Sequence, residues 1–473
     1  MKIGLQYYLN IFKVSTNELE NLIAIALSQG GDYADLYFEN TTYSNIILRD
    51  GEVTSGGFHE DYGVGIRVLK AEKTGYAYSE STDPIDMRKA AQAASTISQG
   101  GAPLKIPAAH QIIQPYDYYP IVSDWRTEPS NTEWLRQLEA EIRSRDNRVD
   151  KVVGMISSSM SDVLMFNSLG ELTVDTRPMG SAVVSVIFTS NGKTVSAHAS
   201  RSFRMGAEMI DRDLILELAD IIMKDLDAKF EAKRPEGGQM SVVMGAGASG
   251  ILLHEAMGHA FEADFNRKGQ SIFSDKMGQK ICSDKINIVD DSTLPWNRGS
   301  GNFDDEGVLG QKTYMVTNGC LTSYLHDRIS AKYYGVAPTG NGRRENFRYN
   351  PIPRMRSTYM EAGDMNPQEI IASVNKGIYV DEFSNGQVKI GEGDFTFFVK
   401  SGFLIENGRL TMPVKDINII GNGPQALADI SMVGDDLIVD EGTWTCGKEQ
   451  NVPVTCGIPT VLVNNLTVGG LQD

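Results

Sequence analysis

The pattern of apolar and polar positions divides the chain into three regions. Near the N-terminus, Ser15 opens a capping box, and apolar residues recur at helical spacing over 19–27, which predicts a helix. Alternating segments on both sides of Asp50-Gly51 then predict an antiparallel hairpin. Asp83-Pro84 predicts the start of another helix, because proline suits the first helical position. We therefore predict a first helix-plus-sheet module over residues 1–105.

A second module is predicted over residues 106–232. The segment from Gly100 to about Trp125 is rich in proline and aromatic residues without a period, which indicates a linker or an extended crossing segment. A helix near Asn131–Arg145 follows, and then alternating segments with a hairpin signal at Asn191-Gly192. A further helix is expected from about Asp211 to Ala232.

The third region, residues 233–473, is β-rich after one short strand and one helical segment. Asn318-Gly319 and Asn407-Gly408 each predict a hairpin within it. We therefore predict an α+β protein in which two N-terminal helix-plus-sheet modules precede a β-rich C-terminal domain. That domain carries the helical segment Ile251–Phe265, which holds the candidate chemistry.

Composition narrows the class of protein. The chain has 44 Lys and Arg against 61 Asp and Glu, a formal net charge of -17, which argues against direct binding of nucleic acid. No stretch approaches the roughly 18 apolar residues of a membrane span, and the N-terminal segment resembles neither a signal peptide nor an anchor. Four cysteines in 473 residues do not suggest a disulfide scaffold. We expect a cytoplasmic protein without a membrane partner.

The segment Ile251–Phe265, ILLHEAMGHAFEADF, places two histidines and three acids in an otherwise apolar stretch. In the H-E-x-x-H signature of zinc proteases the histidines are four residues apart, whereas His254 and His259 are five apart. On an ideal helix that spacing separates the side chains by about 140°. A π-type turn, or a helix that loosens or ends at Gly258, would bring them together. We therefore predict a departure from α geometry between the two histidines.

These residue types favour zinc-hydrolase chemistry. Two imidazoles and one further ligand can hold Zn²⁺ with a position left for water, whose pKa the metal lowers toward neutrality. Glu255 directly follows the first histidine, where the general base of H-E-x-x-H enzymes stands. Candidates for the third ligand are Glu262, Asp264 and the cysteines. The plain alternative is a partly exposed helix that carries polar residues by chance.

A glycine motif offers a competing function. Gly245–Gly250, GAGASG, matches the G-x-G-x-x-G fingerprint of dinucleotide-binding turns. The helix after it carries histidines and acids, however, and the next strand-like run ends at Asp290-Asp291, about forty residues on, where the ribose-binding acid should follow after roughly 20. We favour a tight strand-to-helix turn whose glycines let the helix begin close to the sheet.

The motif HEAMGHAFEADFNRKG resembles the signature of the TldD/PmbA family of zinc metallopeptidases, in the TldD branch that keeps H-E-x-x-x-H. The resemblance covers nearly all of Lys233 to Gly470, and the two N-terminal modules fit the layout of the family. Its further motifs are DDEG at 304–307, PTGNGRRE at 338–345, PIPRM at 351–355, GQVKI at 386–390, SMVGDDL at 431–437, CGKEQNVPV and NLTVGG.

The resemblance implies a zinc-dependent peptidase with a specific ligand set. The family holds its metal with the two histidines and a cysteine in a C-G-K-x-x-Q/N-x-x-P-V context, which implies His254, His259 and Cys446 as ligands in preference to Cys456. It implies unfolded or small peptides, held in extended form, as substrates. It also implies a dimer, either a homodimer or a heterodimer with a paralogue that lacks the motif.

Two neighbouring arginines could take part in substrate binding, and two functions other than a peptidase are kept as alternatives. Arg343 and Arg344 are candidate substrate-binding residues, because an arginine there can bind a peptide terminus or steady an oxyanion; the alternative is a surface loop with solvated charges. Besides the peptidase, we keep a dinucleotide-binding oxidoreductase and a catalytically silent binding subunit of a TldD/PmbA-type complex. The presence of Glu255 argues against the silent subunit.

Overall fold

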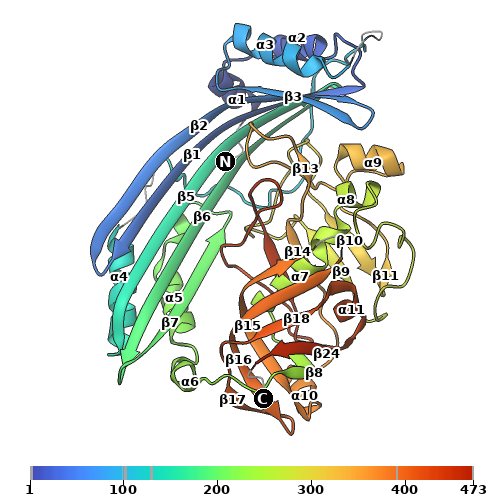
Figure 1. Cartoon of the computed structure of the whole chain (residues 1–473). Coiled ribbons are helices and arrows are strands. Elements are labelled where there is room, and N and C mark those ends of the chain that lie inside the picture. The colour runs from blue at the N-terminus through green and yellow to red at the C-terminus, as the bar shows by residue number, and fades with distance from the viewer. Residues whose placement is uncertain (1–3, 99, 101–103, 128–131, 390–391, 471–473) are drawn as a thin grey trace.

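The protein combines a long curved sheet with a β-rich third domain beside it (Figure 1). The computed structural model describes residues 4–98, 100, 104–127, 132–389 and 392–470. The predicted α+β class is confirmed, with the segment Ile251–Phe265 in the β-rich domain. None of the described helices has the length and apolar character needed to cross a membrane.

The long sheet joins strands from both predicted N-terminal modules. Its order is β3-β2-β1-β5-β6-β4, and β7 also pairs with β6. Strand β1 pairs antiparallel with β5, from Asp35↔Asn167 to Arg49↔Val153, a pairing that the sequence pattern did not indicate. The strands are β1 Tyr33–Arg49, β2 Glu52–Lys70, β3 Lys73–Ser79, β4 His110–Gln111, β5 Val149–Asn167, β6 Glu171–Ser190 and β7 Lys193–Phe203.

Two groups of helices bury separate cores at the two ends of this sheet (Figure 1). The predicted single helix from Asp211 to Ala232 is wrong, because Asp225 adopts a left-handed φ of 53° and divides it into α5 and α6. The expected helix near Asn131–Arg145 is α4, although Asn131 lies outside the described residues, and α1 was not predicted. The helices are α1 Leu5–Phe12, α2 Thr16–Ala26, α3 Pro84–Ser95, α4 Thr132–Arg145, α5 Arg212–Met223 and α6 Leu226–Glu231.

The third domain contains a barrel and a second sheet. The barrel closes in the order β15-β8-β24-β18-β16, because β15 also pairs with β16, while β17 and β19 extend it. Its strands are β8 Gly238–Met244, β15 Lys376–Val388, β16 Asp394–Glu406, β17 Arg409–Pro413, β18 Asn418–Asn422, β19 Ile430–Val433 and β24 Val461–Gly469. The second sheet comprises β9 Ile288–Asp291, β10 Lys312–Thr317, β11 Cys320–Leu321, β14 Ser357–Met360, β20 Ile438–Val439 and β23 Thr455–Ile458.

Short elements connect these sheets and carry the candidate site. The 3-10 turns are η1 Ala207–Met209, η2 Ala248–Gly250 and η3 Gly258–Phe261. The helices are α7 Ile251–Ala256, α8 Ala263–Arg267, α9 Arg328–Tyr334, α10 Pro367–Ala372 and α11 Gly423–Ala428. The two small strand pairs are β12 Gly342–Arg343 with β13 Ile352–Pro353, and β21 Thr445–Cys446 with β22 Val452–Pro453.

The predicted hairpin turns are confirmed. They connect β1 to β2, β6 to β7, β10 to β11 and β16 to β17. In each, φ is between 47° and 50° at the Asp or Asn and between 74° and 83° at the glycine. Positive φ at both central residues is what a type I′ turn requires, and its twist matches that of the flanking strands. The turns are Asp50-Gly51, Asn191-Gly192, Asn318-Gly319 and Asn407-Gly408.

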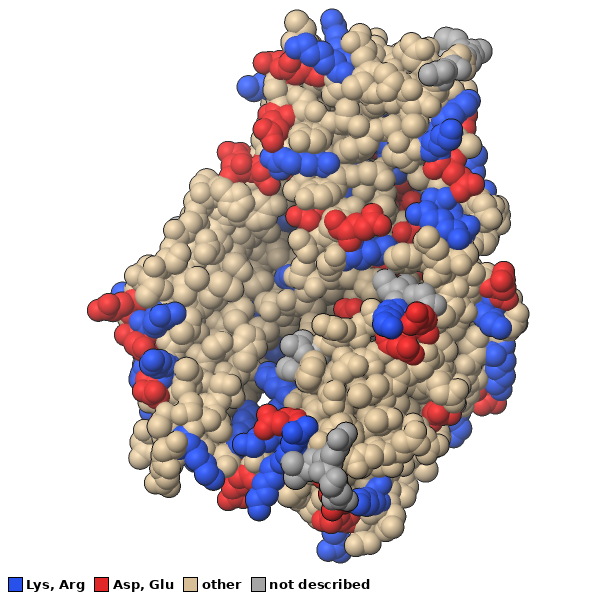
Figure 2. All heavy atoms as spheres, viewed as in Figure 1, with Lys and Arg blue, Asp and Glu red and all other residues tan. Residues whose placement is uncertain are grey.

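A hollow separates part of the long sheet from the third domain, and the sheet side of this hollow shows few charged groups (Figure 2). Elsewhere the two parts are in contact. Tyr37, Val163 and Met165 of the sheet form a buried apolar cluster with Phe303 and Phe347 of the third domain. Near the end of β7, the amide of Ser202 donates to the carbonyl of Glu441 at 2.7 Å. The segment that leads to Cys446 therefore runs beside β7.

Candidate metal centre

The helical segment departs from α geometry between the two histidines, as predicted. Helix α7 ends at Ala256, Met257 adopts φ -131° and ψ -43°, and the 3-10 turn η3 follows. The departure is therefore a helix end, and not a π-type turn. A Cβ at Gly258 would lie 2.2 Å from the sulfur of Met355, so glycine lets the chain turn tightly here.

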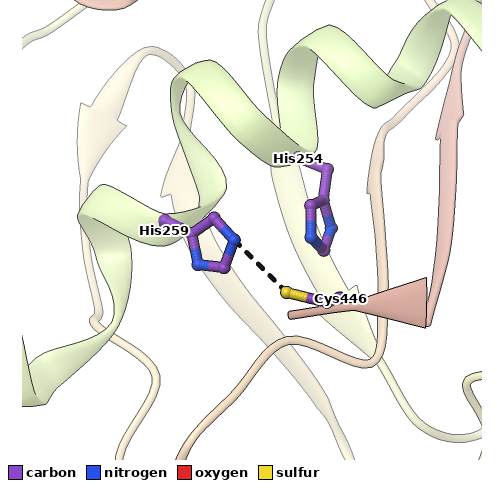
Figure 3. Close-up of side chains that lie close together, drawn as sticks. All are labelled: His254, His259 and Cys446. Atoms are coloured by element: carbon purple, nitrogen blue, oxygen red, sulfur yellow. Dashed lines mark hydrogen bonds between the residues drawn. The ribbon is translucent and has the colours of Figure 1, made fainter. Parts of the chain in front are cut away.

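The structure brings together the three residues predicted as metal ligands. One ligand atom each of His254, His259 and Cys446 lies within 4.8 Å of the others (Figure 3). The Nε2 of His259 is 3.3 Å from the Sγ of Cys446, and the two imidazole centroids are 5.1 Å apart. His254 is 1% exposed, and neither of its ring nitrogens reaches hydrogen-bond geometry with a described residue. Buried polar atoms are normally partnered, so this donor set fits a metal ion.

The charges of these residues favour a thiolate ligand. Burial raises the pKa of the Cys446 thiol, but His254 and His259 outweigh this effect and lower the pKa to about 4. Burial lowers the pKa of His259, whereas the Glu262 carboxylate and Cys446 raise it to about 10. Both shifts favour the charged forms of these two side chains, a thiolate on Cys446 and an imidazolium on His259. A bound metal ion would displace the proton of His259, because a ligating imidazole must be neutral.

A second layer of charged side chains orients the candidate ligands. The Nδ1 of His259 donates to Glu262 at 2.8 Å, which directs the other ring nitrogen toward Cys446. Lys448 lies 3.0 Å from the same carboxylate and 2.8 Å from Asp264. Burial raises the pKa of Glu262, but Lys448 and His259 lower it to about 2. Glu262 is therefore ionised and already paired with His259 and Lys448. Neither Glu262 nor Asp264 belongs to the group formed by His254, His259 and Cys446.

Arg354 fixes the loop that carries Cys446. Its side chain is fully buried and donates to the carbonyls of Cys446 at 2.8 Å, Lys448 at 2.9 Å and Gln450 at 2.7 Å. Its Nε is also 4.0 Å from Glu262. Arg354 therefore connects the cysteine ligand to the carboxylate that orients His259. The sequence pattern singled out neither Arg354 nor Lys448, although both lie in motifs of the family resemblance, PIPRM and CGKEQNVPV.

Cys456 and Glu255 occupy different environments. Cys456 is 1% exposed within the apolar core of the third domain, and burial raises the pKa of its thiol well above 9.0. It is not part of the ligand group, and all four cysteines are free. The Glu255 side chain is 29% exposed, with its Oε2 3.9 Å from the Nε2 of His259. Glu255 therefore lies near the Nε2 of His259 while it keeps access to solvent.

The two candidate arginines are buried. Arg343 donates to the carbonyls of Met355 at 2.6 Å and Pro453 at 2.8 Å. Arg344 is 4% exposed, and its guanidinium carbon lies 4.2 Å from the ring centroid of Tyr37. The alternative of a loop with solvated charges is therefore wrong. Arg343 connects segments of the third domain, whereas Arg344 connects that domain to the long sheet. The role of either arginine in substrate binding stays a prediction.

The glycines of the motif Gly245–Gly250 allow the backbone to turn and pack closely against a strand. Gly247 adopts φ 91° in the turn between β8 and α7. A Cβ at Gly250 would lie 2.8 Å from the backbone nitrogen of Gly457 in β23, so the helix begins directly against a strand. This is the tight strand-to-helix turn favoured over a dinucleotide site.

Comparison with known proteins assigns the family. Residues 34–98 match the PmbA/TldA metallopeptidase domain 1, residues 127–229 match its central domain, and residues 237–470 match its C-terminal domain. The chain belongs to the PmbA/TldD metallopeptidase family. The resemblance inferred from the sequence motifs and the predicted metallopeptidase class are therefore confirmed.

Relatives match this chain along nearly its whole length. A metalloprotease TldD homolog from Haemophilus influenzae is 38% identical and covers 97% of both chains. A zinc metalloprotease TldD homolog from Saccharolobus solfataricus is 27% identical and covers 93% of this chain and 97% of its own. The crystal structure of TldE from Thermococcus kodakarensis, 19% identical, superposes with a TM-score of 0.75 over 96% of this chain and all of its own. At that identity the likeness concerns the fold.

Proposed function

We propose that this metallopeptidase is zinc-dependent and hydrolyses unfolded or small peptides held in extended form. The observation that carries the proposal is the buried His254–His259–Cys446 group with the two unpartnered nitrogens of His254. Imidazole and thiolate are ligands that zinc prefers, and three protein ligands leave a position for water. The zinc named in the Saccharolobus solfataricus relative agrees with this choice.

The side chains around the ligands have distinct tasks in this proposal. Bound zinc would supply Lewis-acid chemistry, lowering the pKa of a water molecule and polarising the peptide carbonyl. Glu255 would act as the general base, accepting a proton from the attacking water at its carboxylate and passing it to the leaving amine, which its position beside His259 and its partial exposure allow. Glu262 holds His259 in one orientation and keeps its Nε2 directed at the centre. Arg354 holds Cys446 in place.

Substrate form and assembly follow from the family resemblance. The hollow between the long sheet and the third domain offers a groove in which an extended chain can lie (Figure 2). We propose a homodimer or a heterodimer with a paralogue that lacks the motif, and a cytoplasmic location. The acidic net charge of -17 gives no support to direct binding of nucleic acid.

Metal removal tests the proposed function. Stripping the protein with a chelator is expected to abolish hydrolysis of a flexible peptide, and added Zn²⁺ should restore it where Mg²⁺ does not, because magnesium prefers oxygen ligands. The assay follows peptide cleavage with metal content measured in the same sample, together with any partner subunit that co-purifies. Full zinc without cleavage would favour the catalytically silent subunit. Cleavage unaffected by complete removal of zinc would contradict the proposal.

Replacement of Glu262 by glutamine is expected to weaken zinc binding about tenfold to a hundredfold, because it removes the charge that orients His259. The measurement is competition for Zn²⁺ against a chelator of known affinity. Asp264→Asn is the matched control, since Asp264 also contacts Lys448 but does not contact His259. Equal losses in the two variants would show that the charge of Lys448, and not the orientation of His259, is what matters.

A further inference from the structure

Four arginines, Arg204, Arg298, Arg343 and Arg356, form no ion pair with any described residue. Arg204, Arg343 and Arg356 are buried, with exposures of 8%, 4% and 3%, and Arg298 is half-buried. Arg204 lies beside the segment of Arg298, because its amide donates to the carbonyl of Trp296 at 2.7 Å and Phe203 bridges to Asn297. Burial lowers the pKa of both Arg298 and Arg343, and Arg204 adds to each shift. Asp175 raises the pKa of Arg204 and Asp305 raises that of Arg343, but burial outweighs both acids, and each pKa is lowered overall.

Three of these guanidinium groups have neutral partners. Arg343 donates to carbonyls of the third domain, as described above. Arg356 donates to the carbonyls of Gly340 at 2.9 Å and Phe303 at 3.1 Å. Arg298 donates to the carbonyl of Trp444 at 2.8 Å, and to the hydroxyls of Ser202 at 2.7 Å and Thr445 at 3.2 Å. Arg298 thus contacts the strand of the cysteine ligand directly.

Arg204 has no such partner. Its side chain makes no hydrogen bond or ion pair with the described residues, and its Nε is fully buried without an acceptor. The contact of its guanidinium is the ring of Tyr119, whose centroid lies 5.4 Å from Cζ. Burial lowers the pKa of Arg204, and Arg177 and Arg356 add to the effect. A buried cation without a partner is rare, so this one requires an explanation.

We propose that Arg204 and Arg298 form a subsite that binds a carboxylate group of the peptide substrate. A guanidinium fork matches the two oxygens of a carboxylate, and the buried Nε of Arg204 lacks the acceptor that a carboxylate would supply. Because Arg298 contacts Thr445, which precedes Cys446, the bound carboxylate lies on the side of the centre that β21 forms. The carboxylate belongs either to the C-terminus of the peptide or to an Asp or Glu side chain. The inference rests on the proposed peptidase function.

Binding of three labelled peptides tests this subsite without turnover. All are flexible, built from Gly, Ser and Ala, and carry a fluorophore at the N-terminus. One has a free C-terminal carboxylate, one a C-terminal amide, and one an amide with a single internal Glu. Affinity is measured by fluorescence anisotropy on the zinc-loaded Glu255→Gln variant. We expect the free-acid peptide or the Glu peptide to bind at least about tenfold more tightly than the neutral amide, as a charge-assisted hydrogen-bonded pair provides. Whichever binds tightly identifies the source of the carboxylate.

Arg204→Met, combined with Glu255→Gln, should remove this preference and leave affinity for the neutral amide unchanged. Its thermal unfolding midpoint should stay equal or rise, because an unpaired buried charge is lost. Arg136→Met, which changes an exposed arginine of α4, is the matched control.

Equal binding of all three peptides before the Arg204 change, or no binding at all, would overturn the proposal. So would equal losses for all peptides with a lowered midpoint, which would show a structural role. Preference for a carboxylate in a wild-type chain that never cleaves would instead contradict the peptidase function alone.

Discussion

Replacing Cys446 with alanine is expected to reduce bound zinc from one ion per chain to a trace and to abolish peptide hydrolysis. The thiolate is one of the three proposed ligand groups, and although burial raises the pKa of Cys446, the two histidines lower it to about 4. Two histidines alone bind zinc far more weakly, because structural and catalytic zinc sites use at least three protein ligands. Zinc per chain is measured by elemental analysis after gel filtration, and hydrolysis is assayed on the same sample.

Cys456→Ala is the matched control for this experiment. Cys456 is the same residue type in a similar T-C-G context, but it lies in the apolar core and outside the ligand group. Its replacement should leave zinc and activity in place, with at most a small loss of stability from the lost sulfur. If Cys456→Ala loses zinc while Cys446→Ala keeps it, the proposed ligand assignment is wrong.

Features set by neighbouring residues could be predicted from the sequence. An Asn-Gly or Asp-Gly pair tolerates positive φ at both positions, so the four hairpin turns followed from their own residues. The break after α7 followed in the same way, because His254 and His259 are five residues apart and cannot share a metal ion on a regular helix. Neighbouring residues did not decide between a π-type turn and a helix end. The close approach of Gly258 to Met355, far along the chain, favours the helix end.

Features that depend on distant contacts could not be predicted. The pairing of β1 with β5 brings Tyr43 opposite Ser159, and nothing in either strand identifies the other as its partner. Arg354 reaches the carbonyl of Cys446 across 92 positions of sequence, so its position in PIPRM says nothing of this role. The isolation of Arg204 is likewise a property of the folded chain, because it depends on which acids fail to reach it.

Replacing Glu255 with glutamine is expected to lower peptide hydrolysis about a hundredfold to ten-thousandfold while zinc stays bound. The amide keeps the shape and hydrogen-bonding reach of the carboxylate but cannot accept a proton at neutral pH. Glu255 lies outside the ligand group, and its Oε2 is 3.9 Å from the Nε2 of His259, so its loss should leave the three ligands in place. Rates are measured on a flexible peptide, with zinc content and oligomeric state recorded for the same preparation and any partner subunit supplied.

The contrast between Glu255→Gln and Glu262→Gln separates catalysis from metal binding. Glu262 is fully buried and bonded to His259, so its replacement should act through zinc affinity and recover in part when excess Zn²⁺ is added. Glu255→Gln should show no such recovery, because its zinc is already in place and the missing group is the proton acceptor. Near-normal turnover of Glu255→Gln with full zinc would eliminate it as the general base. Loss of zinc from this variant would instead make Glu255 a ligand or a structural support, because zinc would then depend on the Glu255 carboxylate for its binding.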